Sequence, residues 1–327
     1  MKDENEFPKT LLEATRYFAN PDVALQFMVS MRWPDGIVKC PRCDSARVNF
    51  TAKRRVWTCE DCPKRRQFSI KVGTIMEDSP IGLDKWIIGM WLVTSAKNGI
   101  SSYELHRSLG ITQKSAWFLG HRIRAAIQSG SMVRSQLTGT VEVDESYIGG
   151  LARNMHKNTK KRRGITGTGG VGKTAVQGLL QRHSGGHSKV IAEVVEHTRG
   201  SLLNLNVRKY VLKGTEIHTD ALPAYRELNE EFTHKVVDHA ECYVKDGVHT
   251  NGMENFWSLL KRGIKGTYVS VEPFHLFRYL SEQVFRFNER KYEDGDQGRF
   301  LKACAGIFGI RLDYATLTGQ TGPASLR

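Results

Sequence analysis

The chain has 327 residues, 40% of them hydrophobic and 25% charged, a composition that is typical of a folded protein and argues against an intrinsically disordered one. This length predicts two or three domains. The 48 Lys and Arg residues outnumber the 34 Asp and Glu residues. The resulting formal charge of +14 favours a polyanionic partner, of which nucleic acid is the commonest.

No apolar segment of signal-peptide type follows the polar N-terminal residues, and no run of eighteen apolar residues occurs in the chain. We therefore expect a cytoplasmic protein without membrane contact. Four of the six cysteines form two CxxC pairs. In a reducing compartment this pattern indicates a metal site rather than disulfides.

Residues 1–36 carry apolar side chains at helical spacing, interrupted at Asn20-Pro21 and followed by the turn sequence Trp33-Pro34-Asp35-Gly36. This pattern predicts an N-terminal helical segment of two short helices.

Residues 37–75 contain the two CxxC pairs, which are separated by fifteen residues that can form a β-hairpin. Each pair directs two thiolates to one point, so the pairs can complete a tetrahedron around Zn²⁺, and four thiolates leave no open position for a substrate. A redox role for one pair would not require the other. We therefore expect a zinc ribbon with a structural metal, held by Cys40, Cys43, Cys59 and Cys62.

Basic residues surround these cysteines, and Arg54 and Arg55 lie in the predicted hairpin between them. Such a surface suits a phosphate backbone. The alternative is a ribbon that docks against another domain.

Residues 80–130 are predicted to be helical and to contain a helix-turn-helix. Gly110 can end a first helix, and Thr112 can cap a second. The first turn of the second helix presents Gln113 and Lys114, and this end is the one that enters a major groove. A plain helical hairpin would share much of the pattern, but the turn and the polar first turn favour the helix-turn-helix.

Residues 167–174 match the phosphate-binding pattern GxxxxGK[ST], which requires a buried strand before it and a helix after it. The preceding run, Lys160-Lys161-Arg162-Arg163, reads as a basic loop, and residues 175–180 are strand-like. We therefore reject a nucleotide-binding site. Residues 146–192 hold nine Lys or Arg and no Asp or Glu, which favours a nucleic acid contact over a merely solvated face.

Three carboxylates fall at related positions. Asp144 and Asp220 each stand at the end of a predicted strand, and Glu254 lies on a predicted helix with Asn251 and, two turns later, Lys261 on the same face. Cleavage of a phosphodiester by two Mg²⁺ ions needs hard oxygen ligands, which these acids can supply. Each acid alone is commonly a surface carboxylate. Their joint pattern predicts a site for Mg²⁺ or Mn²⁺ at Asp144, Asp220 and Glu254.

The stretch 141–290 resembles the DDE transposase superfamily, whose RNase H-like fold brings two aspartates and a glutamate together. Asp144 matches the first acid and Asp220 the second. Glu254 matches the third, with 33 residues between it and Asp220, and Lys261 matches the lysine two turns later.

More closely, the chain resembles bacterial insertion-sequence transposases of ISXO type, which carry a zinc ribbon ahead of the catalytic domain. The resemblance covers nearly the whole chain and is carried by several motifs, among them Arg32-Trp33-Pro34-Asp35-Gly36 before CPRC, Val143-Asp144-Glu145-Ser146-Tyr147-Ile148-Gly149-Gly150, His218-Thr219-Asp220, His249-Thr250-Asn251 and Trp257-Ser258-Leu259-Leu260-Lys261-Arg262. Asn251 could be aligned with the third acid. We prefer Glu254, because an amide is a poorer Mg²⁺ ligand than a carboxylate.

From these patterns and this resemblance we expect a multidomain α/β protein. Its parts are an N-terminal helical segment (1–36), a zinc ribbon (37–75), a helix-turn-helix domain (80–130), an RNase H-like mixed α/β catalytic domain (138–290) and a C-terminal tail (291–327).

The resemblance implies a nucleoid-associated bacterial enzyme that binds transposon-end inverted repeats, cleaves DNA strands with metal and transfers them to target DNA, working as a homo-multimer (dimer or higher). DNA contacts are expected at Arg54, Arg55, Gln113, Lys114, Lys160, Lys161, Arg162 and Arg163, and at Lys261 and Arg262 near the scissile bond. Two alternatives stay open: a transposase-derived DNA-binding regulator that is catalytically silent, and a stand-alone RNase H-like nuclease or resolvase.

Overall fold

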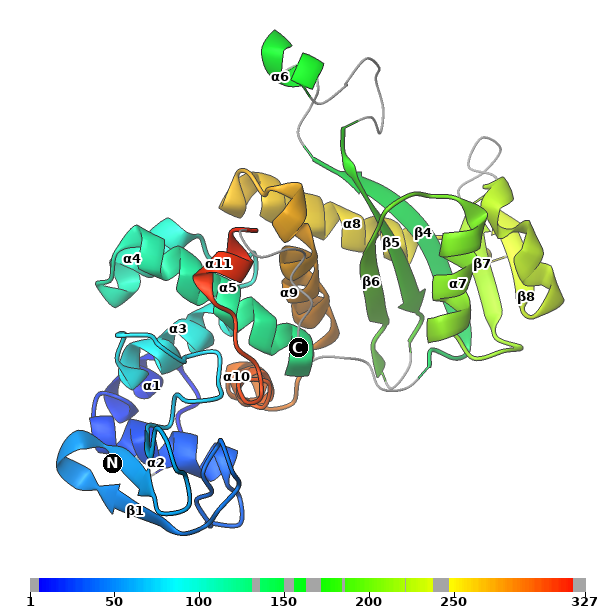
Figure 1. Ribbon diagram of the computed structural model, residues 1–327. Helices are drawn as coiled ribbons and strands as arrows, with labels where there is room; N and C mark the ends of the chain where they lie inside the picture. The colour runs from blue at the N-terminus through cyan, green and yellow to red at the C-terminus, as the bar shows by residue number, and fades with distance from the viewer. Residues whose placement is uncertain are drawn as a thin grey trace. The chain divides into compact units, whose positions relative to one another are not determined.

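A computed structural model describes residues 6–130, 136–149, 156–162, 172–183, 186–220, 222–237 and 247–319 (Figure 1). The chain divides into two compact units: unit 1 is Met1–Ser131 with Tyr292–Arg327, and unit 2 is Met132–Lys291. Within the described ranges, no helix combines the length and the apolar character needed to cross a bilayer.

Unit 1 begins with the two predicted helices, α1 (Leu11–Tyr17) and α2 (Pro21–Arg32). The Thr10 hydroxyl caps α1, and the Asn20 side chain caps α2 by accepting a backbone N–H, with Pro21 at the first helical position. The Asn20-Pro21 break therefore ends one helix and begins the next.

A three-stranded antiparallel sheet follows, in the order β1 (Val48–Thr51), β2 (Val56–Cys59) and β3 (Gln67–Phe68). The 3-10 turn η1 (Ala52–Arg54) joins β1 to β2. Trp57 of β2 is buried, and its ring stacks on Phe68 at 5.7 Å between centroids. The β-hairpin predicted between the CxxC pairs is therefore present.

Two helices then form the predicted helix-turn-helix pair, α4 (Ser102–Leu109) and α5 (Gln113–Gly130). Gly110 ends α4 in the left-handed region, with φ 59°, where a side chain would be strained. The Thr112 hydroxyl accepts the Ser115 N–H at 3.2 Å and so caps α5. Both boundaries lie where the sequence pattern predicted them.

The structure differs from the tail expected for residues 291–327. Helix α10 (Gly295–Cys304) packs against α3 (Leu83–Ser95), with 4.9 Å between the ring centroids of Phe300 and Trp91. Phe300 and Trp91 are both fully buried. Burial of these two large aromatic side chains stabilises unit 1, so the segment is part of its core.

The short helix α11 (Tyr314–Leu317) also belongs to unit 1. Leu312 and Leu317 are buried in one cluster with Ala125 of α5. The Arg122 guanidinium of α5 donates to the Leu312 carbonyl at 2.9 Å. The chain beyond α10 therefore returns to the helix-turn-helix and holds its second helix.

Unit 2 contains a five-stranded mixed sheet in the order β6-β5-β4-β7-β8. Strand β4 pairs antiparallel with β5 and parallel with β7, while β5–β6 is antiparallel and β7–β8 parallel. The strands are β4 (Thr140–Ile148), β5 (Thr174–Gln181), β6 (Lys189–Val195), β7 (Glu216–Asp220) and β8 (Thr233–Val237).

Helices cover both faces of this sheet (Figure 1). On one face, α7 (Gly200–Tyr210) and η4 (Pro223–Glu230) pack on Val141, Val143, Leu179 and Ile217. Segment η4 is a 3-10 helix where the pattern predicted a helix without specifying its type. On the other face, α8 (Asn251–Gly263) and α9 (Leu276–Asn288) pack on Val176, Leu180 and Val190. Between α8 and α9 lie η5 (Ile264–Tyr268) and η6 (Pro273–His275), and α6 (Lys157–Arg162) lies between β4 and β5.

These two units confirm the predicted class, a multidomain α/β protein with N-terminal helices, a cysteine-bearing ribbon and a mixed α/β sheet domain.

Candidate active site and zinc centre

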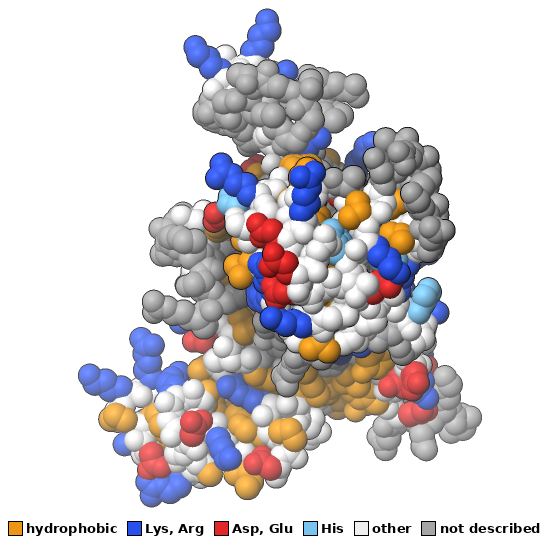
Figure 2. All heavy atoms as spheres, turned by 90° about the vertical axis from the view of Figure 1, so that its right-hand side faces the viewer, with side chains coloured by type: hydrophobic (Ala, Val, Ile, Leu, Met, Phe, Trp, Pro, Cys, Tyr) orange, Lys and Arg blue, Asp and Glu red, His pale blue; other side chains and the backbone are white. Residues whose placement is uncertain are grey.

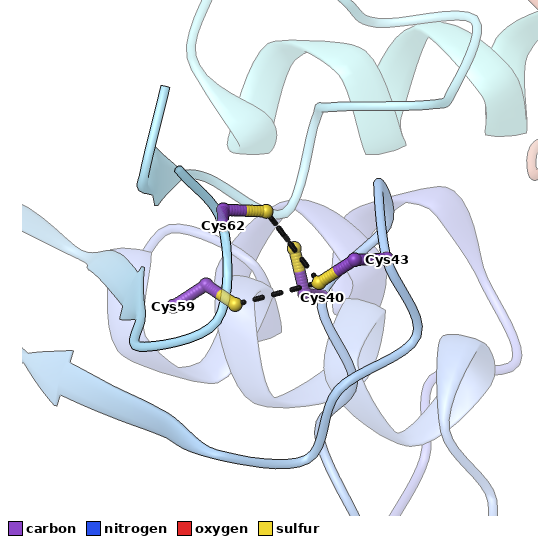
Figure 3. Close-up of side chains that lie close together, drawn as sticks. All are labelled: Cys40, Cys43, Cys59 and Cys62. Carbon is purple, nitrogen blue, oxygen red and sulfur yellow. Dashed lines mark hydrogen bonds between the residues drawn. The ribbon is translucent and has the colours of Figure 1, made fainter. Parts of the chain in front are cut away.

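The side chains of the four cysteines point toward one another (Figure 3). Their Sγ atoms all lie within 4.8 Å of one another, and the Sγ–Sγ distances are 3.6 Å for Cys40–Cys62, 3.6 Å for Cys43–Cys59 and 3.4 Å for Cys43–Cys62. Zn–S bonds of ~2.3 Å in a tetrahedron set sulfurs about 3.8 Å apart, whereas a disulfide needs about 2.05 Å. The cysteines therefore form the structural zinc centre that the spacing predicted.

Local backbone geometry produces this convergence. Asp44 directly after the first CxxC pair and Arg65 after the second adopt left-handed conformations, with φ 56° and 52°. The Cys40 N–H donates to Ser45 and the Cys59 N–H donates to Arg66, each at 2.9 Å, so each knuckle turns back on itself. The two turns thus direct the four thiolates to one point, where zinc binds.

Asp144 and Asp220 lie on neighbouring parallel strands. Glu142 of β4 stands opposite His218 of β7, and continuing this register by two residues sets Asp144 beside Asp220. Because successive side chains of a strand alternate between faces, Asp144 shares a face with Glu142, whose carboxylate contacts α8. The parallel register thus brings the two carboxylates together. Asp220 ends β7 as predicted, but Asp144 does not end its strand, because β4 continues to Ile148 through its pairing with β5.

Helix α8 packs closely on this face. The Trp257 Nε1–H donates to Asp144 Oδ2 at 3.0 Å, and the indole is buried. Gly178 of β5 stands opposite Asp144, and a Cβ there would lie 2.2 Å from Met253 Cε and 2.8 Å from the Trp257 ring. The missing side chain at Gly178 therefore lets α8 approach the sheet and orient Asp144.

We expect Gly178→Ala to lower the free energy of unfolding of unit 2 by about 1–3 kcal/mol, the usual cost of overpacking a core. The rigid Trp257 ring has to shift to admit the methyl group. Denaturant unfolding measures the loss, with Gly266→Ala as control because a Cβ there would meet nothing within 4 Å. Equal stabilities for the two variants would contradict this packing.

One face of α8 is buried and the other is open. Met253, Phe256, Trp257 and Leu260 face the sheet, whereas the exposed side chains include Asn251, Glu254, Lys261 and Arg262. The expectation that Asn251, Glu254 and Lys261 share one helix face agrees with this pattern. The Glu254 carboxylate lies close enough to Asp144 to act on its ionisation.

The electrostatics of the site are unfavourable for a third negative charge. The pKa of Asp144 is raised to about 6, mainly by burial and also by the charges of Asp220 and Glu254, although hydrogen bonds from the Glu145 N–H and Trp257 lower it. Burial likewise raises the pKa of Glu145 to about 9, with Asp144 and Asp220 as the next causes. A bound divalent cation would offset this accumulation of negative charge.

Among the described residues, only the four cysteines bring three or more ligand atoms together as a metal-binding group. The three carboxylates converge on one region but do not close around one point, as expected of like charges that no cation draws together. Hard carboxylate oxygens from Asp144, Asp220 and Glu254 still match what Mg²⁺ or Mn²⁺ requires. Their assignment as ligands stays a prediction.

Sequence reasoning missed two residues of this region. Glu142 is 1% exposed, and Arg182 donates to it through Nε at 2.6 Å. Glu142 lies on β4, and its partner Arg182 lies 40 positions away, directly after β5. No local sequence pattern indicates this pair, because the two residues come together only through the pairing of β4 with β5.

The ribbon residues expected to contact DNA differ in their surroundings. Arg54 is exposed at the tip of the β1–β2 hairpin. Arg55 is half-buried, and its Nε donates to Asp22 Oδ1 of α2 at 2.8 Å. Arg54 is therefore the more available of the two for a phosphate.

The first turn of α5 is similarly divided. The Gln113 amide donates to the Ser102 hydroxyl of α4 at 2.9 Å, so it helps to join the two helices. Lys114 is exposed, with its Nζ 4.8 Å from the centroid of the Tyr314 ring. Lys114 keeps its charge at the surface, where the expected groove contact requires it.

The basic run before β5 is partly described. Lys160 and Lys161 lie on α6, whose lysines stand at the top of the space-filling view (Figure 2). The Arg162 side chain and Arg163 lie outside the described residues. Thr174, the last residue of the rejected phosphate-loop pattern, begins a strand, β5, and not a helix, which agrees with that rejection.

Comparison with known proteins agrees with this geometry. Residues 136–288 match the ISXO2-like transposase domain, and residues 20–65 match the transposase zinc-ribbon domain. The chain thus contains a region similar to the ISXO2-like transposase domain, preceded by a region similar to the transposase zinc ribbon. A curated relative, described as an uncharacterized protein in transposable element ISH50 of Halobacterium salinarum, is 28% identical over 256 residues, which cover 75% of this chain and 83% of the relative. The resemblance predicted from the motifs is confirmed.

The match to the transposase domain includes Asp144, Asp220 and α8. The match to the zinc ribbon includes α2 and all four cysteines.

Proposed function

We propose that this transposase binds the terminal repeats of its insertion sequence and catalyses metal-dependent DNA cleavage and strand transfer. The observation that carries the proposal is the juxtaposition of Asp144 and Asp220 on adjacent parallel strands, with α8 packed across the same face and Glu254 near enough to influence Asp144. Three hard oxygen ligands near one another, two of them on adjacent strands, are what phosphodiester chemistry with Mg²⁺ requires.

Asp144, Asp220 and Glu254 would hold Mg²⁺ or Mn²⁺. When bound, the metal activates the attacking hydroxyl, first of water and then of the freed 3′ end, and stabilises the leaving oxygen. The strands fix the two aspartates, and the buried face of α8 fixes the glutamate, so the protein contributes orientation more than proton transfer. No covalent link between protein and DNA is needed.

DNA binding would use cations on several elements. Lys261 and Arg262 are exposed on the last turn of α8, on the same helix as Glu254, and would hold the phosphate next to the scissile bond. Arg54 of the ribbon and Lys114 of α5 would bind the transposon end, and the lysines of α6 would hold either end or target DNA. Joining two ends to one target requires a homo-multimer, of at least two copies.

The third acidic position separates two assignments. We expect Glu254→Gln to lower the rate of strand cleavage by two or more orders of magnitude, because an amide replaces a charged ligand of the metal. Asn251→Ala is expected to change the rate less than about tenfold, since the exposed amide begins the helix but would not hold the metal. Single-turnover cleavage compares the two, and a greater loss for Asn251→Ala would reassign the position.

A catalytically silent DNA-binding regulator is the second candidate function. It would keep the zinc ribbon and the helix-turn-helix, but it would not need three carboxylates near one another. A stand-alone nuclease would keep the carboxylates and produce nicks that are never joined. The retained acids favour an active enzyme over the regulator.

Cleavage of labelled duplexes that carry the element's own ends tests the proposal. The protein is incubated with Mg²⁺, Mn²⁺ or EDTA, and denaturing gels locate the cuts. We expect metal-dependent cuts at the boundary of the terminal repeat, and none in a scrambled duplex. Tight end binding without any cut in either metal would support the regulator and exclude the enzyme.

A further inference from the structure

Glu142 is a buried carboxylate two residues before Asp144, on the face of the sheet that α8 covers. Its side chain is 1% exposed. Burying a charge is costly unless hydrogen bonds and an opposite charge compensate for it. The partners of Glu142 therefore indicate why the residue is there.

Two donors bind the two carboxylate oxygens. Arg182 Nε donates to Oε1 at 2.6 Å, and the backbone N–H of Met253 donates to Oε2 at 2.9 Å. Met253 is the third residue of α8, so the carboxylate binds a free N–H of the helix's first turn. The positive end of the helix dipole also favours an anion at this point.

Arg182 extends the contact to the segment that leads into α8. Its Nη2 donates to the His249 carbonyl at 2.6 Å, and its Nη1 donates to the Gly247 carbonyl at 3.2 Å. The Arg182 backbone N–H pairs with the Thr140 carbonyl at 2.9 Å, which ties it to the start of β4. One guanidinium thus links the sheet to the approach of α8, while Glu142 links the sheet to its first turn.

The first turn of α8 lies so close to Glu142 that a side chain would not fit. A Cβ at Gly252 would lie 2.8 Å from Glu142 Oε2 and 3.1 Å from Leu180 Cδ1. The helix begins without a side-chain cap from Thr250. The carboxylate on the sheet therefore takes the capping role that the residue before a helix usually fills.

We propose that Glu142, held by Arg182, is a positioning residue that fixes the first turn of α8 and so sets Glu254 opposite Asp144. The inference rests on the proposed function, because it assumes that Glu254 holds the metal. Glu254 follows Met253 directly, so a shift of the anchored N–H displaces the carboxylate with it. Residues that orient metal ligands commonly change metal affinity or activity 10–100-fold when they are lost.

The test compares Glu142→Gln and Arg182→Lys with Glu193→Gln in the full chain. Glutamine has one acceptor oxygen for the two donors, and lysine lacks the planar fork that reaches several acceptors. Glu193 lies in β6 of the same sheet, two strands from Glu142 of β4. There it accepts from the Tyr210 hydroxyl and pairs with Lys209. Single-turnover cleavage is measured over a range of Mg²⁺ concentrations.

We expect both anchor variants to raise the Mg²⁺ concentration for half-maximal rate 10–100-fold, while end-DNA affinity stays within about twofold. The control should match the wild type. Hydrogen exchange in residues 249–256 should accelerate in the anchor variants, because the hydrogen bond from the Met253 N–H to residue 142 is weakened when either Glu142 or its Arg182 partner is changed. Exchange is measured without metal or DNA, so this readout does not depend on activity.

The outcomes distinguish a failure of the proposed function from a failure of the positioning role. Wild-type protein that does not cleave, although exchange accelerates in the anchor variants, would overturn the proposed function while the anchor itself holds. Wild-type protein that cleaves, together with anchor variants of unchanged Mg²⁺ requirement and unchanged exchange, would overturn the positioning role. A lower fraction of active protein at an unchanged Mg²⁺ requirement would likewise overturn it, since it reports misfolding alone.

Discussion

Replacing Asp220 with asparagine is expected to lower the rate of DNA strand cleavage about a thousand-fold, which corresponds to about 4 kcal/mol of transition-state stabilisation. The amide keeps the size of the side chain but removes a charged ligand from the predicted metal site. Asp220 closes β7, where its Oδ1 also accepts the Leu222 N–H at 3.2 Å, a bond that an amide oxygen can keep. The loss should therefore fall on catalysis and not on folding.

Glu196→Gln provides the matched control, because it makes the same carboxylate-to-amide change at an exposed residue of unit 2. Both variants should unfold at the wild-type denaturant concentration and bind end DNA as the wild type does. Cleavage by Asp220→Asn at more than a tenth of the wild-type rate would remove Asp220 from the metal site.

Removal of zinc is expected to have the largest effect on folding. Structural zinc sites contribute roughly 10–16 kcal/mol of binding free energy at neutral pH, which exceeds what a ribbon of three short strands can supply alone. We expect Cys40→Ser, or a strong chelator, to unfold the ribbon and to lower end-DNA affinity at least tenfold. Near-ultraviolet circular dichroism of Trp57 and Trp33, whose rings pack at 5.9 Å, reports this unfolding.

Cys304→Ser is the control for thiol loss, because this cysteine is fully buried in α10 and outside the zinc centre. It should retain zinc at one ion per chain, measured by atomic emission. Unit 2 should keep its own unfolding transition in the zinc-free protein. A zinc-free ribbon with unchanged tryptophan signals and unchanged DNA affinity would contradict a structural role for the metal.

Parts of this architecture could be predicted because local rules determine them. The CxxC spacing sets the zinc centre, since each knuckle needs only its own turn. The break at Asn20-Pro21 and the cap at Thr112 are also local. Asp220 could be placed because it ends a strand-like pattern, whereas the pattern around Asp144 did not reveal that β4 continues to Ile148.

Other parts depend on tertiary contacts that no window of sequence contains. The Glu142–Arg182 pair joins two strands through their register, so neither residue looks unusual in its own segment. Residues 291–327 were predicted to be a tail, yet Phe300 is fully buried against α3, and Leu317 is fully buried in a cluster with α5. The hydrogen bond from the Gln113 amide to the Ser102 hydroxyl of α4 also depends on how the two helices pack.

Strand transfer of a pre-cleaved, labelled transposon end into plasmid DNA tests the central claim most directly. In this reaction the 3′-hydroxyl already exists, so the joining step alone is measured in Mg²⁺ or Mn²⁺. We expect joined products with wild-type protein and none with Asp144→Asn, although both proteins bind the transposon end equally. End binding by the wild type without any joined product in either metal would contradict it.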